Sequence, residues 1–148
     1  MTKQPTAAAA GFLPKDEVDR ADAYLADLAG RLGLSGWDVW VAAEPSKDGA
    51  LAHVEPTEGR RVAPVHLCSD WPERGPEDKR QILVHELLHL VHRDQTDLIR
   101  SALPESGYLP DGAYRLLWES FRLATEVMVD HLAQVLAPFM PPWPSDTD

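Results

Sequence analysis

The 148-residue sequence contains a single cysteine and has no long apolar run. The lone thiol, Cys68, excludes an internal disulfide framework and is typical of a reducing compartment. No apolar run approaches the ~20 residues that a membrane-spanning helix needs, and the stretch Ala7 to Ala10 is too short for the core of a signal peptide. We therefore expect a cytoplasmic protein that does not associate with membranes.

Basic residues are also scarce, because 14 Lys and Arg stand against 24 Asp and Glu, for a formal net charge of −10. Non-specific nucleic-acid binding depends on Lys and Arg that displace counterions from phosphates, so no nucleic-acid partner is expected. The hydrophobic fraction of 44% and charged fraction of 26% are those of an ordinary globular protein. The length fits one domain with one core, and no pattern indicates the oligomeric state.

Apolar periodicity and turn residues predict an α+β domain over residues 14–137. It is expected to follow a flexible arm, residues 1–13, and to precede a proline-rich acidic tail, residues 138–148. The tail either docks onto a partner or folds back onto the domain, although such tails are more commonly disordered. The first helix is expected from Pro14 to about Leu32, because apolar residues recur there at steps of three and four.

Three strand-like stretches follow the first helix, at residues 37–42, 50–54 and 62–68. Short connections between them favour an antiparallel meander of three strands. Pro64 lies in the third stretch and cannot donate to a ladder, which predicts an edge position for that strand.

The second helix is expected to begin at Pro76 and to run to about Arg93. Residues 82–91 are apolar on nearly every side of it, which indicates a buried helix. The polar exceptions are His85, Glu86 and His89. Residues 94–112 are expected to be mostly irregular, with a short helix near 97–103, and a last helix is expected over residues 113–137.

His85, Glu86 and His89 form the pattern His-Glu-x-x-His in the middle of this helix. A spacing of four residues places both imidazoles on one helix face, about 6 Å apart along the axis. Both can then bind one tetrahedral Zn²⁺ ion at about 2.0–2.1 Å. Glu86 points beside the metal, where it can take a proton from zinc-activated water. Burying three titratable groups together without a metal would be costly.

The last helix supplies the best candidate for a third zinc ligand, Glu126. Asp130 stands one turn further on and could accept the free ring N–H of a ligand histidine. Four apolar neighbours are expected to mark buried faces around them: Leu123, Val127, Met128 and Leu132. Two alternatives remain open: His131 is the third ligand instead, or Glu126 pairs with Arg122 on a solvated face.

These two segments, His85-Glu86-x-x-His89 and Glu126-x-x-x-Asp130, resemble the gluzincin metallopeptidases, the family of thermolysin. The order of elements is similar to that of minimal gluzincins, such as ImmA/IrrE-type peptidases and metallopeptidases encoded by phages and prophages. The resemblance implies a minimal zincin-like fold, a zinc ion held by His85, His89 and Glu126, and Glu86 as the catalytic base. It also implies that Asp130 orients a ligand histidine.

The expected function is hydrolysis of peptide bonds, with a peptide or protein as substrate. The alternative is a zinc-containing binding or regulatory module that cleaves nothing. By resemblance, the edge strand of the sheet, taken as residues 62–68, holds the substrate through main-chain hydrogen bonds. Three further residues are candidates for oxyanion or substrate contacts: His66, Tyr108 and Tyr114. For His66 a half-exposed position on the strand is expected, and the two tyrosines have packing or surface positions as their alternative.

Overall fold

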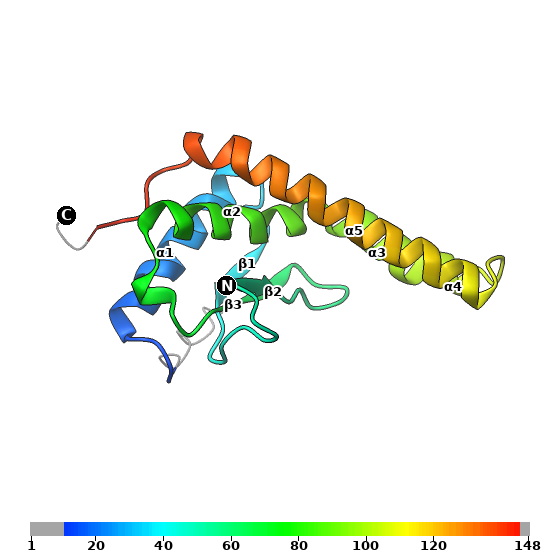
Figure 1. Cartoon of the computed structure of the whole chain (residues 1–148), viewed down its shortest axis with the longest axis horizontal. Coiled ribbons are helices and arrows are strands. Elements are labelled where there is room, and N and C mark those ends of the chain that lie inside the picture. Colours follow the sequence, from blue (N-terminus) through cyan, green and yellow to red (C-terminus); the bar gives the residue numbers. More distant parts are fainter. Residues whose placement is uncertain (1–10, 146–148) are drawn as a thin grey trace.

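The computed structural model describes residues 11–145, so the segment 1–10 of the expected arm and residues 146–148 of the expected tail lie outside the described residues. The fold is α+β (Figure 1), as expected. Its helices and strands are α1 (Lys15–Arg31), β1 (Asp38–Val41), β2 (Ala52–Val54), β3 (Val62–Leu67), η1 (Trp71–Glu73), α2 (Pro76–Val91), α3 (Arg93–Asp97), η2 (Leu98–Ala102), α4 (Leu103–Glu105), α5 (Asp111–Leu136) and η3 (Ala137–Phe139).

The three strands form a mixed sheet in the order β1-β3-β2. β3 pairs parallel with β1 and antiparallel with β2, so the expected antiparallel meander is wrong, and so is the edge position of residues 62–68. Pro64 is tolerated in the central strand because it lies opposite Glu55, just past the end of β2, and its carbonyl accepts the Glu55 N–H at 3.0 Å. The N–H that Pro64 lacks would therefore lie just past the last pair of the β2–β3 ladder.

Helix α2 lies between the sheet and α5 (Figure 1). Alternate residues of β3, namely Ala63, Val65 and Leu67, are completely buried on the face that meets the helices. Leu83 and Leu87 are completely buried on α2 as well. A helix covered on two sides explains why its apolar residues lie nearly all around it, as the sequence predicted.

Residues 93–105 are helical, which confirms the short helix expected near 97–103 and extends it on both sides, with a π-helical segment, η2, in the middle. Pro104 directly follows the π-helical segment and has no N–H to donate to the Arg100 carbonyl, four residues earlier; that carbonyl instead accepts from the Tyr114 hydroxyl at 2.9 Å. Together with the first half of α5, these short helices project from the body of the molecule (Figure 1). Within residues 11–145, no helix combines the length and the apolar character needed to cross a membrane.

The expected buried faces of α5 are wrong in part, because Leu123 is 61% exposed, Val127 71% and Met128 39%. Val129 and Ala133 are the residues of this helix that are buried. The projecting part of α5 lies beside the short helices (Figure 1), and its apolar side chain Leu116 is 71% exposed.

The end of the described chain folds back onto the domain, one of the alternatives left open for the tail. Trp143 is 6% exposed, and its ring contacts Tyr24 and Trp71 edge to face, with centroids at 5.2 and 5.7 Å. The Tyr24 hydroxyl donates to the Pro141 carbonyl at 2.6 Å. At the other end Leu13 is buried in the same core, so the domain extends past both expected boundaries.

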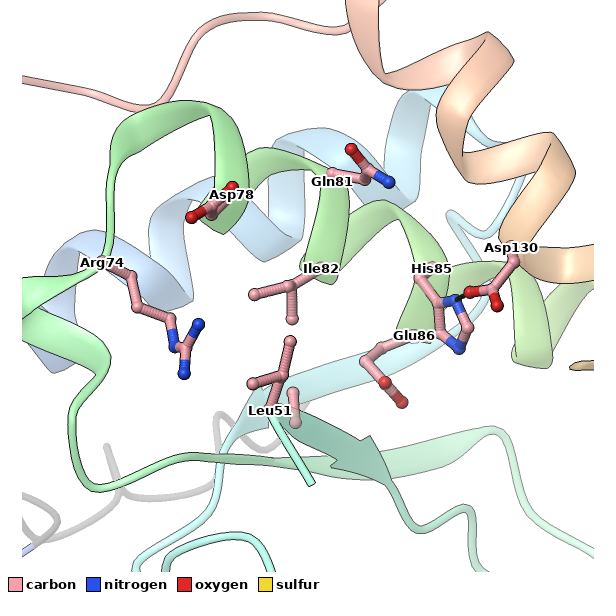
Figure 2. Close-up of a pocket in the computed structure, with 9 residues that line it drawn as sticks. Leu51, Arg74, Asp78, Gln81, Ile82, His85, Glu86 and Asp130 are labelled. Carbon is pink, nitrogen blue, oxygen red and sulfur yellow. Dashed lines mark ion pairs between the residues drawn. The ribbon is translucent and has the colours of Figure 1, made fainter. Parts of the chain in front are cut away.

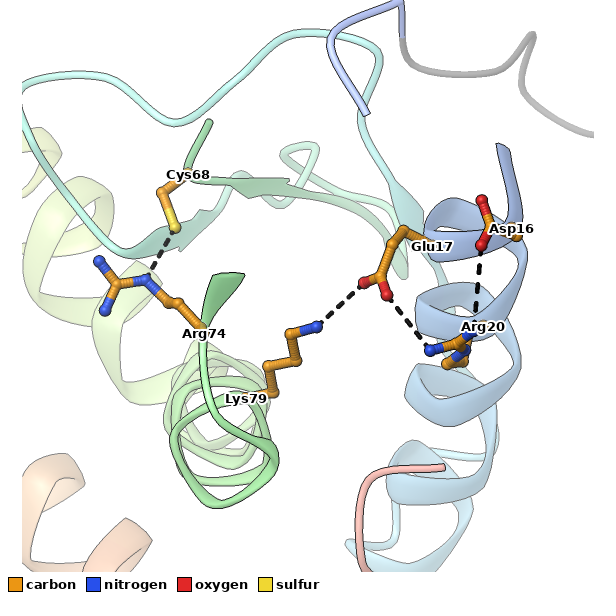
Figure 3. Close-up of polar contacts among 6 residues, drawn as sticks. All are labelled: Asp16, Glu17, Arg20, Cys68, Arg74 and Lys79. Atoms are coloured by element: carbon orange, nitrogen blue, oxygen red, sulfur yellow. Dashed lines mark hydrogen bonds and ion pairs between the residues drawn. The ribbon is translucent and has the colours of Figure 1, made fainter. Parts of the chain in front are cut away.

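A buried ion pair joins α1 to α2 (Figure 3). Lys79 Nζ lies 3.1 Å from Glu17 Oε2, and both residues are less than 10% exposed. Arg20 also contacts Glu17, at 3.2 Å. The Lys79 ammonium lies 5.0 Å from the centre of the Trp143 ring, so the pair and the tail stabilise each other. The Glu17–Lys79 pair fixes the start of α2, the helix that carries His85 and His89.

Candidate metal centre

His85 and His89 lie one turn apart on α2, and their Nε2 atoms are 3.2 Å apart. Helix α5 crosses α2 at this point and places the carboxylate of Glu126 against both rings. Its oxygens lie 3.5 Å from His85 Nε2 and 3.4 Å from His89 Nε2. Three potential ligands from two helices therefore converge, although Glu126 lies 37 residues after His89 in the sequence.

These separations fit a tetrahedral zinc ion. Bonds of about 2.0–2.1 Å at tetrahedral angles place neighbouring ligand atoms about 3.3–3.4 Å apart. The two Nε2 atoms are 3.2 Å apart, and each lies near a different oxygen of Glu126, Oε2 at 3.5 Å from His85 and Oε1 at 3.4 Å from His89. The side chains of His85 and His89 are about one-fifth exposed, and that of Glu126 is 47% exposed. The cluster therefore opens to solvent on the side of α5, which leaves a position for a fourth ligand.

Asp130 fixes the chemical form of His85. Its Oδ1 lies 2.8 Å from His85 Nδ1 (Figure 2). A carboxylate only accepts hydrogen bonds, so Nδ1 carries the proton, and in the neutral ring Nε2 then presents a lone pair toward His89 and Glu126. A cation placed beside His85 Nε2 and the Glu126 oxygens would be stabilised by these lone pairs.

Burial also lowers the pKa of His89, with a smaller effect in the same direction from His85; the nearby Glu126 carboxylate opposes them. Metal ligation requires a neutral imidazole. A depressed pKa therefore favours the form of His89 that can bind a metal at neutral pH.

Glu86 lies next to the cluster but not in it. It is 7% exposed, and its Oε2 accepts the main-chain N–H of Val54 at 2.9 Å. Burial is the largest effect on its pKa, which rises to about 8; the Val54 bond lowers it, and the charge of Glu126 raises it. At neutral pH this carboxyl can both hold and release a proton, as a general acid–base group must.

Two cavities of about 410 and 500 Å³ meet at the cluster, and both are lined by Ala52, His85 and Glu86. The first extends past Leu51, Ile82 and Arg74 (Figure 2). The second passes His89 and Glu126. The two are halves of one groove that runs between α2 and the edge strand β2.

The orientation of β2 turns main-chain groups toward this groove. Leu51 accepts from Cys68 and Glu55 donates to Pro64, so every second residue of the strand bonds to β3. The intervening residues, Ala52 and Val54, direct their N–H and C=O groups away from β3. Sequence reasoning missed this role of β2, because the strand order that exposes it depends on a parallel pairing between segments 24 residues apart.

The remaining candidates are not at the histidine pair. His66 is 6% exposed, not half-exposed as expected, because it lies on the central strand; its Nδ1 is 3.0 Å from the Glu44 carbonyl. Tyr108 is 91% exposed. The Tyr114 hydroxyl donates to the Arg100 carbonyl at 2.9 Å. None of the three lines either half of the groove.

The structure also bears on the two alternatives for Glu126, namely His131 as the third ligand and a pair between Glu126 and Arg122. His131 is exposed on α5 and lies outside the group of potential ligands that contains Glu126. Arg122 pairs with Glu119 at 3.3 Å, and Glu126 faces the histidines. Arg122 and Arg93 instead line the second half of the groove, where no sequence motif drew attention to them.

The chain is thus an α+β protein with a cluster of two histidines and a glutamate that could hold a metal ion. No protein-family model matches its sequence, and comparisons with curated proteins and with solved structures found no significant match.

Proposed function

We propose that this protein is a zinc-dependent metallopeptidase of the gluzincin type. The observation that carries the proposal is the spacing of His85, His89 and Glu126, which suits a tetrahedral ion, with the acid Glu86 buried beside it. A structural metal site has no use for an additional carboxyl group held off the metal. A catalytic site needs one there.

Zinc held by these three residues would supply Lewis acidity, which acidifies a water molecule and polarises the scissile carbonyl. Glu86 would take the proton from that water and deliver it to the leaving nitrogen, so the carboxyl is regenerated in each cycle. Its raised pKa suits both transfers. Val54 would hold the carboxylate at the required place through its N–H.

The groove favours an extended peptide as substrate. A peptide laid along β2 could pair with the main-chain groups of Ala52, as in recognition by strand addition. Leu51 and Ile82 offer apolar surface for one of its side chains. The proposed substrate strand is therefore β2 rather than residues 62–68.

A second candidate function, a zinc-containing binding module, is favoured by one observation. Leu116, Leu123 and Val127 are each more than 60% exposed on α5, and exposed apolar side chains on a projecting helix suit a partner protein. In this case Glu86 has no catalytic task.

The test is cleavage of a mixed library of quenched fluorescent peptides by the zinc-loaded parent and by Glu86→Gln. We expect cleavage by the parent and a loss of roughly 100-fold or more in the variant, with zinc content unchanged. Glu119→Gln, on the exposed side of α5, is the matched control and should cleave like the parent. Zinc-loaded parent that cleaves no peptide would favour the binding module.

A further inference from the structure

A second group of potential metal ligands lies on the sheet, and the proposed function does not use it. His53 on β2 faces His66 on β3 in the strand register, and Glu55 follows β2 directly. One ligand atom from each of the three residues lies within 4.8 Å of the others. These side chains emerge from the sheet face opposite that of Val65 and Leu67, since side chains alternate along a strand.

The chemical form of His66 is fixed by its surroundings. Its Nδ1 lies 3.0 Å from the Glu44 carbonyl, which can only accept a hydrogen bond, so Nδ1 carries the proton. In the neutral ring Nε2 is then an acceptor with a lone pair. This is the arrangement in which a main-chain carbonyl orients a ligand histidine.

The Nε2 atom of His66 has no hydrogen-bond partner in the described part of the chain, although it is completely buried. Glu55 Oε2 lies 3.2 Å from it, but off the direction in which a ring N–H would donate. Buried polar atoms without partners are rare and call for an explanation. A cation on the lone-pair axis of Nε2 would give this atom a partner. It would also account for the position of the Glu55 oxygen, because two ligand atoms of one ion lie about 3.3–3.4 Å apart and point at the ion, not at each other.

His53 completes the group. Its ring stacks on that of His66 with centroids 4.3 Å apart and planes 7° from parallel. Two imidazoles in this position cannot both be protonated without repulsion, and the neutral forms are metal ligands. His53 is half-buried on the edge strand, and one of its ring nitrogens already lies within 4.8 Å of the ligand atoms of Glu55 and His66. The Glu55 side chain is 66% exposed and leaves the site open to solvent.

We propose that His53, Glu55 and His66 form a second binding site for a divalent transition metal, distinct from the cluster on α2. Two imidazole nitrogens and one carboxylate oxygen suit zinc in particular. The ion would clamp β2 to β3 and to the segment that carries Glu44. Because Val54 donates to Glu86, a clamped β2 would also hold Glu86 in place.

The test is the zinc content of desalted, zinc-loaded protein, measured by mass spectrometry of the metal. We expect two zinc ions per chain in the parent and one in either His53→Ala or Glu55→Gln. Glu58→Gln, in the same connection between β2 and β3 and exposed, is the matched control and should bind two. Circular dichroism shows whether each variant is folded, and neither His53 nor Glu55 is buried.

His89→Ala separates this proposal from the proposed function. One ion in His89→Ala and none in the double variant with His53→Ala would support both sites. A single ion in the parent that His89→Ala removes and His53→Ala retains would overturn the second site alone. A single ion that only His53→Ala removes would support the second site and contradict the first, and no ion in the parent would contradict both.

Discussion

At the scale of single residues, the chemistry of the groove depends on two carboxyl groups with different surroundings. Glu86 is buried and holds its proton up to a pKa of about 8. Asp130 has a side chain that is 65% exposed and acts on the site through His85 Nδ1. Their proposed tasks, proton transfer and orientation of a ligand, can be separated by experiment.

The raised pKa of Glu86 predicts how stability depends on pH in the metal-free protein. In chelator, the folded state keeps the Glu86 proton up to about pH 8, whereas the unfolded chain releases it near 4.5. The stabilisation is therefore present below pH 4.5 and lost as pH rises toward 8, by up to about 1.4 kcal/mol per pH unit.

Urea unfolding at pH 6.5, 7.0 and 7.5 measures this effect, with Glu86→Gln as reference because it cannot ionise. The parent should lose stability relative to the variant across this range. The lowered pKa of His89 acts mainly below pH 6.5, and it is common to both proteins. Parallel curves for the two proteins would contradict the burial of an ionisable Glu86.

Asp130 predicts a change in zinc affinity. Replacing a residue that orients a ligand histidine commonly weakens metal binding by about 10–100-fold, so Asp130→Ala should bind zinc that much more weakly by competition with a chromophoric chelator. Asp130→Asn keeps an oxygen acceptor for His85 Nδ1 and should lose less. Equal affinities for the parent and both variants would show that Asp130 does not act on the site.

At the scale of elements, the position of α2 decides whether the histidines meet Glu126. The helix is held at its start by the Glu17–Lys79 pair and along its length by the sheet and α5. Because Arg20 contacts Glu17 as well, removing Lys79 and removing Glu17 should have unequal effects on stability.

The buried pair predicts unequal losses of stability. Glu17→Gln removes the carboxylate that neutralises Lys79 inside the core, and such a change typically costs about 3–5 kcal/mol. Lys79→Met should cost less, because Glu17 keeps its contact with Arg20 and methionine fills the space beside Trp143. Urea unfolding of the two variants measures the order, and a larger loss in Lys79→Met would contradict it.

At the scale of the whole molecule, both ends of the described chain close the core on the side where α1 meets α2. Trp143 contacts Tyr24 and Trp71, and Leu13 lies in the same core. Trp143→Ala should therefore lower the free energy of unfolding by about 3–5 kcal/mol, the usual cost for a buried aromatic residue.

Phe139→Ala provides the control for this prediction, since Phe139 is 80% exposed and lies only four residues earlier. Its loss should remain within about 0.5 kcal/mol, as for exposed sites generally. Thermal or urea unfolding compares the two variants. Similar losses for both would show that the tail does not pack as described.

Local patterns in the sequence predicted α1, α2, α5 and the approximate positions of the three strands, because helix periodicity and β-branched runs are local signals. They also singled out His85, His89 and Glu126, which the fold brings together. The strand order was not predicted, because Pro64 was interpreted as the mark of an edge strand. A proline is tolerated in the central strand here only because β2 ends before it, and the sequence around Pro64 does not show where β2 ends. The burial of Trp143 could not be predicted from local patterns either, since its aromatic partners, Tyr24 and Trp71, lie more than 70 residues away.

The proposed function depends above all on a zinc ion held by His85, His89 and Glu126. Anomalous scattering at the zinc absorption edge, from crystals of zinc-loaded protein, locates that ion. We expect a peak within about 2.0–2.2 Å of His85 Nε2, His89 Nε2 and a Glu126 oxygen, whether or not a second peak lies at His66. Fully loaded crystals with no peak among these three side chains would contradict it.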